Sequence, residues 1–139
     1  MNREPAIRIT YFLLRVVAGL LIFQPGAMKL FGWYGGMPQG VEMTTQLWIA
    51  GILEVVGGIL IMLGLFTRPA AFILSGEMAV AYFQGHQPMG TWPVQNNGAP
   101  AVLLCFIFLF VAAYGGGAWS LDAVIKDKQA PNREPALPG

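Results

Sequence analysis

Several polar side chains occur inside or beside strongly apolar segments of this 139-residue chain, where their chemistry could be used. Lys29 closes the first apolar segment, Glu54 lies in the second, and His86 follows the third. A lysine ammonium can stabilise an anionic oxygen, whereas a carboxyl group or an imidazole can move a proton. Reduction of a quinone carbonyl needs both functions. We therefore interpret Lys29, Glu54 and His86 as a candidate proton and quinone site.

Two amides and two aromatic residues complete this polar group, which we expect in the outer half of the bundle. They are Gln24, Gln84, Trp33 and Trp92, and we interpret them as ligand-binding residues beneath an aromatic rim. A second interpretation stays open at this point. The same groups could simply satisfy one another's hydrogen bonds around Pro25, which removes a backbone donor from the first segment.

A further pair of charges, Arg15 and Glu77, is expected deeper in the apolar segments. A rise of about 1.5 Å per residue along each helix places both side chains roughly 10 Å from the inner boundary. Either charge alone would be costly in hydrocarbon. The sequence therefore predicts a structural ion pair between Arg15 and Glu77 that joins the first and third segments.

The elements that carry these residues are predicted to be membrane-spanning helices. The chain is 55% hydrophobic and only 11% charged, with a mean hydropathy of +0.58, which is more apolar than a soluble domain. Apolar segments cover about residues 9–31, 47–66, 70–84 and 101–115. They are too long and continuous for the alternating strands of a membrane barrel. We predict an all-α bundle of four transmembrane helices.

The distribution of basic residues predicts the orientation of this bundle. The connections 32–46 and 85–100 contain no lysine or arginine, so the positive-inside rule places them outside the cell membrane. The basic residues lie before the first span, between the second and third, and after the fourth: Arg3, Arg8, Arg68, Lys126, Lys128 and Arg133. Both termini are therefore predicted to be cytoplasmic, in a multi-pass inner-membrane protein with the lipid bilayer as its first partner.

We predict one membrane domain over residues 1–125 and a Pro-rich C-terminal tail over residues 126–139. Ser120 is a candidate cap for a short amphipathic helix that reaches Lys126. Glycines recur in the spans and are expected to allow close helix packing. They are Gly19, Gly51, Gly57, Gly58, Gly64 and Gly76.

Composition and motifs argue against several other functions. A net charge of +1 gives no basic field for nucleic acid. The chain has no histidine pair for haem, no cysteine cluster for iron and sulfur, no nucleotide-binding glycine loop and no evident metal site. The single Cys105 cannot form a dithiol. No cofactor is predicted from evident ligands, and a quinone is the one candidate.

From about Leu14 to Asp122 the chain resembles the DoxX family of small four-helix membrane proteins. The matching motifs are Gly26-x-x-Lys29-Leu30-Phe31-Gly32, Gly51-x-x-Glu54-x-x-Gly57-Gly58, Gly64-Leu65-x-Thr67-Arg68, His86-x-Pro88-x-Gly90-x-Trp92 and Ser120-Leu121-Asp122. The family pattern usually has a histidine where this chain has Pro25. If that histidine transfers a proton in other members, only Lys29, Glu54 and His86 remain for the task here.

The resemblance implies a link to thiosulfate:quinone oxidoreductase and to terminal-oxidase or redox-stress assemblies. Two functions therefore stay open. The chain could be an accessory subunit of a membrane respiratory or redox complex, which its small size and lack of cofactor ligands favour. The alternative is a self-contained quinone-linked oxidoreductase subunit. A transporter is less favoured, because the chain has only four short spans without repeated broken helices.

Overall fold

The computed structural model describes residues 2–130, and every regular element in that part of the chain is helical. The all-α prediction is confirmed for these residues. The elements are α1 (Glu4–Phe31), η1 (Trp33–Gly35), α2 (Thr45–Leu63), α3 (Thr67–Ala81), η2 (Tyr82–His86), η3 (Gln87–Met89), α4 (Pro93–Asn96), α5 (Ala99–Tyr114) and α6 (Leu121–Gln129).

The four long helices correspond to the four predicted apolar segments, and local capping sets their different boundaries. α2 begins at Thr45 because the Thr44 hydroxyl accepts a hydrogen bond from the backbone N–H of Leu47 (3.3 Å). It ends at Leu63 because Gly64 adopts a left-handed conformation with φ of 68°. α1 starts at Glu4, earlier than predicted, and continues through Pro25 to Phe31.

Two of these helices, α1 and α2, are long and apolar enough to cross a membrane. α5 is apolar but shorter, with 16 residues. α3 has 15 residues, and the π-helical turn η2 extends it to His86. This extension carries the last turn of the predicted third segment, residues 82–84, which α3 itself does not include.

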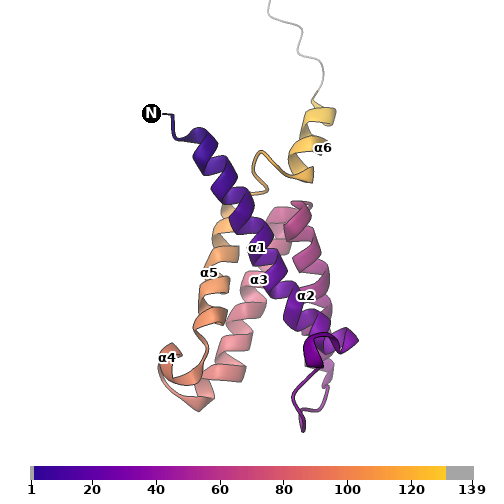
Figure 1. The fold of residues 1–139 in the computed structure, drawn as a ribbon, viewed down its shortest axis with the longest axis vertical. Helices are drawn as coiled ribbons and strands as arrows, with labels where there is room; N and C mark the ends of the chain where they lie inside the picture. The colour runs from indigo at the N-terminus through magenta and orange to yellow at the C-terminus, as the bar shows by residue number, and fades with distance from the viewer. Residues whose placement is uncertain (1, 131–139) are drawn as a thin grey trace, which may run out of the picture.

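The helices are arranged in two pairs that lie against each other. α1 packs along α2, and α3 packs along α5, while α2 and α3 join the pairs (Figure 1). The N-terminus and α6 lie at one end of the molecule, and α4 lies at the other, together with the connection between α1 and α2. The chain therefore gathers its lysine- and arginine-free connections at a single end.

α1 and α2 approach each other closely through glycine. A Cβ atom added to Gly19 would lie 2.8 Å from the carbonyl oxygen of Gly58, and one added to Gly58 would lie 2.8 Å from that of Gly19. Gly76 differs, since an added Cβ would meet nothing within 4 Å. The predicted packing role of Gly76 is therefore wrong, because this glycine is exposed on α3.

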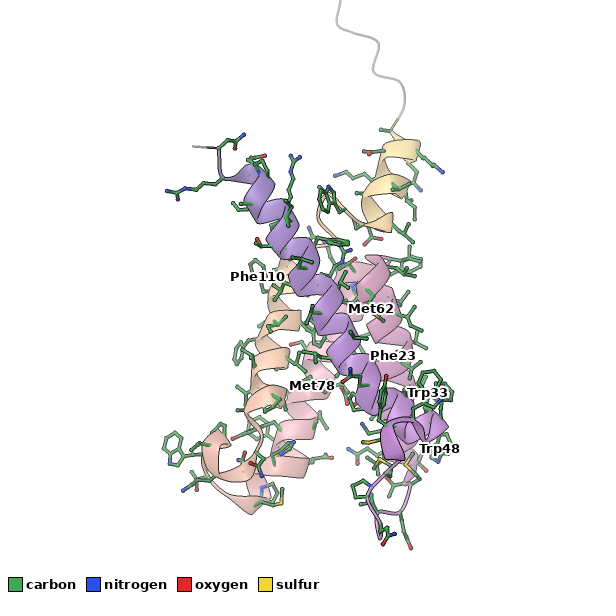
Figure 2. The ribbon with its side chains drawn as sticks, in the orientation of Figure 1. Phe23, Trp33, Trp48, Met62, Met78 and Phe110 are labelled. Carbon is green, nitrogen blue, oxygen red and sulfur yellow. The ribbon has the colours of Figure 1, made fainter. Side chains whose placement is uncertain are left out.

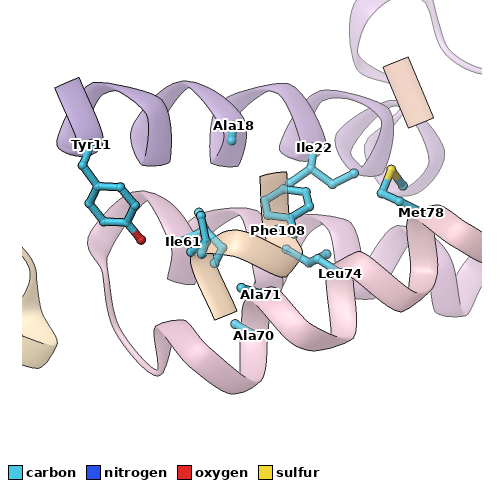
Figure 3. Close-up of a cluster of buried hydrophobic side chains, with 10 residues drawn as sticks. Tyr11, Ala18, Ile22, Ile61, Ala70, Ala71, Leu74, Met78 and Phe108 are labelled. Atoms are coloured by element: carbon cyan, nitrogen blue, oxygen red, sulfur yellow. The ribbon is translucent and has the colours of Figure 1, made fainter. Parts of the chain in front are cut away.

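The apolar core draws side chains from all four long helices. Ile22 of α1, Ile61 of α2, Leu74 of α3 and Phe108 of α5 are each at most 1% exposed and lie in one cluster (Figure 3). Many other large apolar side chains face outward along the helices, for example Leu13, Val56, Phe72 and Phe106. A hydrocarbon solvent accounts for this exposure, which water would oppose.

The short helix after α5 is tied to the turn between α2 and α3. The Ser120 hydroxyl caps α6 by accepting a hydrogen bond from the backbone N–H of Ala123 (3.1 Å), as predicted. The Asp122 carboxylate accepts hydrogen bonds from the N–H groups of Phe66 (2.9 Å) and Thr67 (3.0 Å). Burial acts to raise the pKa of Asp122, but hydrogen bonds from Thr67 and Phe66 outweigh burial and hold the pKa below its ordinary value.

α6 extends to Gln129, so residues 126–129 of the predicted tail are helical. The remainder of that predicted Pro-rich tail, residues 131–139, lies outside the described residues.

Candidate functional site

Lys29 and Glu54 form a buried ion pair between α1 and α2. The Lys29 ammonium donates to both carboxylate oxygens of Glu54, with Nζ–Oε1 and Nζ–Oε2 distances of 2.8 and 2.6 Å. Their side chains are only 12% and 3% exposed. Both residues belong to the polar group that the sequence analysis expects in the outer half of the bundle. A pair buried to this degree interacts strongly, because little water screens it.

Two glycines make this pairing possible. A Cβ atom on Gly26 would lie 2.7 Å from Cβ of Glu54 and 2.9 Å from the backbone nitrogen of Val55. A Cβ atom on Gly51 would lie 2.9 Å from Leu30 Cδ2 and 3.3 Å from Lys29 Cβ. The absence of side chains at Gly26 and Gly51 therefore lets the two helices close around the ion pair.

Glu77 of α3 lies beside this pair. Among the residues that the structure describes, Glu77 forms no salt bridge, and its Oε2 atom is buried without a hydrogen-bond partner. The predicted Arg15–Glu77 ion pair is therefore wrong. Counting depth along straight helices placed the two residues at one level, but it could not determine which way each side chain points.

Arg15 instead binds backbone carbonyl groups at the opposite end of the bundle. Its guanidinium donates to the carbonyl oxygens of Ile61 (2.9 Å) and Trp119 (2.8 Å), and also to that of Gly116. The residue is 1% exposed. These acceptors belong to the last turn of α2 and to the segment after α5. Arg15 thus connects three parts of the chain, and it forms no salt bridge within residues 2–130.

A cavity of about 520 Å³ opens beside the Lys29–Glu54 pair, between α2 and α3. Most of its wall is apolar and comes from these two helices: Leu47, Ile49, Ala50, Leu53, Ile73, Val80 and Ala81. Polar groups line the remainder: Lys29, Gln46, Glu54, Glu77, Gln84 and His86. This volume lies in the range of small-molecule sites, which are mainly apolar with a few polar groups.

The outer end of the cavity holds two of the predicted site residues. The side-chain Oε1 of Gln84 in η2 accepts a hydrogen bond from the side-chain Nε2 of Gln46 in α2. His86 Nδ1 lies 3.0 Å from the carbonyl oxygen of Asn96, and its ring stacks on Tyr82. Because η2 is a π-helical turn, it places His86 at the cavity instead of continuing the register of α3.

Asn96, which the sequence-based interpretation missed, holds the loop that carries His86. It is 1% exposed and donates to the Gly90 carbonyl (2.9 Å) and the Tyr82 hydroxyl (3.3 Å). Its Oδ1 accepts a hydrogen bond from Gly98 N–H (2.8 Å). No local pattern in the sequence distinguishes this asparagine from an ordinary loop residue, because all of its partners except Gly98 are set by the tertiary fold.

Three predicted ligand-binding residues lie outside the cavity wall. Trp33 packs against Phe23 and Phe31 at the end of α1 (Figure 2), with ring centroids 6.1 and 5.4 Å apart. Trp92 is 65% exposed at the start of α4. Gln24 is half-buried in α1 and is not part of the lining. The structure therefore brings Lys29, Glu54, Gln84 and His86 together, but not these three.

The arrangement can bind an apolar molecule that carries a polar head group. The ammonium of Lys29 and the carboxyl groups of Glu54 and Glu77 offer a hydrogen-bond donor, acceptors and a proton site at one end of an apolar chamber. Within residues 2–130, no group of three or more histidine, cysteine, aspartate or glutamate residues is placed to hold a metal ion.

Known proteins place the chain in a family. A protein of Haemophilus influenzae described as uncharacterized is 42% identical over 119 residues, which cover 81% of this chain and 89% of the relative. No solved structure matches the chain. The DoxX family model matches residues 10–87, which include the Lys29–Glu54 pair, Glu77 and His86. The chain belongs to the DoxX family.

Proposed function

We propose that this DoxX protein is an accessory subunit of a membrane respiratory or redox complex, to which it contributes a quinone-binding cavity. In this proposal α1, α2, α3 with η2, and α5 each cross the inner membrane, and both termini are cytoplasmic. The loops of residues 32–44 and 87–98 then lie on the outer side.

The observation that carries the proposal is the cavity between α2 and α3. It combines apolar walls with the Lys29–Glu54 pair, and wall residues also reach the outer surface of the bundle. Ile49, Ile73 and Val80 are 55%, 50% and 47% exposed, respectively. In a bilayer these side chains face lipid, so a lipophilic molecule can enter sideways without crossing water. A quinone has the apolar body and the polar carbonyl groups that such a cavity fits.

Each polar group has a task in this proposal. The Lys29 ammonium orients a quinone carbonyl and stabilises negative charge on its oxygen. Glu54 holds the ammonium in place and, with Glu77, provides a carboxyl group for proton exchange. His86 lies at the outer end, where it can exchange protons with the outer aqueous phase. Electrons come from a partner subunit.

Native mass spectrometry tests the assignment on protein purified gently from its own membrane. We expect a complex that contains this 15.0 kDa chain, larger cofactor-bearing subunits and a quinone-sized adduct. A protomer or homo-oligomer that carries the adduct alone would instead support the alternative, a self-contained quinone-linked subunit. Absence of quinone from every species would overturn the cavity proposal.

A steric variant provides the matched control for this experiment. Ala50→Trp fills the cavity but leaves Lys29, Glu54 and Glu77 intact, so it should remove the adduct while the complex remains assembled. Arg8→Gln changes an exposed charge far from the cavity and should retain the adduct. Retention of quinone by Ala50→Trp would place the binding site elsewhere.

A further inference from the structure

Three charged side chains from three helices line the cavity. Lys29 comes from α1, Glu54 from α2 and Glu77 from α3. Both hydrogen bonds of the Lys29 ammonium within the described residues go to Glu54. Among the described residues Glu77 forms no salt bridge, and its Oε2 atom is buried without a partner. The cluster thus has two carboxyl groups and one ammonium.

Charge balance limits the protonation of this cluster. One ammonium with two carboxylates would leave an uncompensated negative charge beside apolar walls, which is costly. The carboxyl groups of Glu54 and Glu77 also line the same cavity as Lys29. Two carboxylates repel each other at close range, whereas a protonated carboxyl group beside a carboxylate does not. A single proton on the two groups therefore removes both the excess charge and the repulsion.

We infer that Glu54 and Glu77 hold one proton between them beside Lys29, that this proton resides on Glu77, and that Glu77 donates it in a hydrogen bond to an oxygen atom of the molecule in the cavity. Glu54 uses both oxygens to hold the ammonium, which leaves the proton to Glu77. The identity of the acceptor, a quinone carbonyl oxygen, rests on the proposed function. The sequence-based interpretation had assigned Glu77 a structural role with Arg15.

The shared proton makes binding in the cavity depend on pH. At low pH Glu77 donates a hydrogen bond to the carbonyl oxygen. When the pair loses its proton at higher pH, the donor is lost and a negative charge faces that oxygen, so binding weakens. The other charged or titratable groups at the cavity are Lys29 from α1 and His86 from η2, and His86 lies at the outer end.

Infrared spectroscopy of the full chain in lipid nanodiscs tests the shared proton without any quinone. We expect the C=O stretching band of one protonated carboxylic acid at neutral pH, with a shift on deuterium exchange. Glu77→Gln and Glu54→Gln should each lose the band, because the single remaining carboxylate then pairs with Lys29. Lys29→Met should increase the band, since neither carboxyl group then has a cation.

The matched control is Glu42→Gln, which removes an exposed glutamate from the outer loop and should leave the band unchanged. A wild-type spectrum without the band would overturn the inference. This test does not depend on the folding of any variant. A band that persists in Glu77→Gln would overturn it as well.

Titration with decylubiquinone separates this inference from the proposed function. We expect binding to weaken about tenfold, the equivalent of one hydrogen bond, as the pair loses its proton. Glu77→Gln should remove this pH dependence, and the control Glu42→Gln should retain it. If the protein shows the infrared band but binds no quinone, the proposed function is overturned and the inference about the proton stands. If the protein binds quinone but shows no infrared band, the inference about the proton is overturned and the proposed function stands.

Discussion

At the scale of single residues, the buried cations Arg15 and Lys29 are stabilised in different ways. Lys29 pairs with a carboxylate, whereas Arg15 donates to backbone carbonyl groups at the ends of two helical segments. The difference follows from side-chain shape. The planar guanidinium presents several fixed donors and can bind carbonyls in different directions, while the flexible ammonium acts as a compact charge.

Arg15→Met should therefore destabilise the protein by roughly 2–4 kcal/mol, because buried carbonyl groups of Ile61 and Trp119 lose their donor. The cost should be independent of Glu77, with which Arg15 shares no hydrogen-bond partner. In the double variant Arg15→Met/Glu77→Gln, the two free-energy changes should add within about 0.5 kcal/mol. Unfolding by detergent titration in mixed micelles measures these values. A double variant that is more stable than Arg15→Met alone would instead indicate that Arg15 and Glu77 form an ion pair.

At the scale of elements, the contact between α1 and α2 depends on backbone-to-backbone approach at Gly19 and Gly58. Gly19→Ala places a methyl group against the Gly58 carbonyl and the Met62 side chain, so the helices must separate. We expect Gly19→Ala to lower the free energy of unfolding by about 1–3 kcal/mol. Gly76→Ala is the matched control in α3, where the methyl group meets only open space. It should be neutral or stabilise by up to about 1 kcal/mol, because alanine has the higher helix propensity.

Both variants can be compared with wild type in the same unfolding titration. Equal losses for Gly19→Ala and Gly76→Ala would indicate that flexibility of glycine, and not helix contact, determines the effect.

Asp122 links α6 to the start of α3 in a way that depends on pH. Its hydrogen bonds to the N–H groups of Phe66 and Thr67 hold its pKa below the ordinary value in the folded protein. Its contribution is therefore fully present above the unfolded-state pKa of about 3.9 and is lost as pH falls through the lower folded-state pKa. Asp122→Asn should lower the free energy of unfolding by about 1 kcal/mol at neutral pH, as the loss of other helix caps does.

Thermal unfolding in detergent between pH 3 and pH 7 checks this prediction, and the stability of wild type and variant should converge at the acidic end. Hydrogen exchange at Phe66 and Thr67 provides a local measurement. A stability difference that does not change with pH would exclude the carboxylate as its cause.

At the scale of the whole molecule, the two ends of the bundle have different characters. One end gathers the basic residues Arg3, Arg8, Lys126 and Lys128, while the connections without lysine or arginine lie at the other (Figure 1). Single cysteines in a Cys105→Ala background should reveal this polarity in intact cells. A membrane-impermeant maleimide should label Gln39→Cys and Val94→Cys from outside, and Asn2→Cys and Lys128→Cys only after permeabilisation. Labelling of Lys128→Cys in intact cells would contradict cytoplasmic termini.

The sequence by itself determined the helical character of the chain, the approximate position of each apolar helix and the family. These properties depend on local composition, on periodicity and on caps such as Ser120 and Gly64. It also grouped Lys29 and Glu54 in one candidate site, because both residues belong to the outer half of the predicted bundle.

Only the tertiary structure decided the partners of Glu77, Arg15 and Asn96. Position along a helix gives the depth of a residue, but the direction of its side chain depends on helix rotation and on contacts that are distant in sequence. The rotation of α3 places Glu77 in the wall of the cavity that Glu54 also lines, and the carbonyl groups after α5 supply acceptors for Arg15. The cavity arises in the same way, because its walls belong to helices whose separation is set by packing and not by any local pattern.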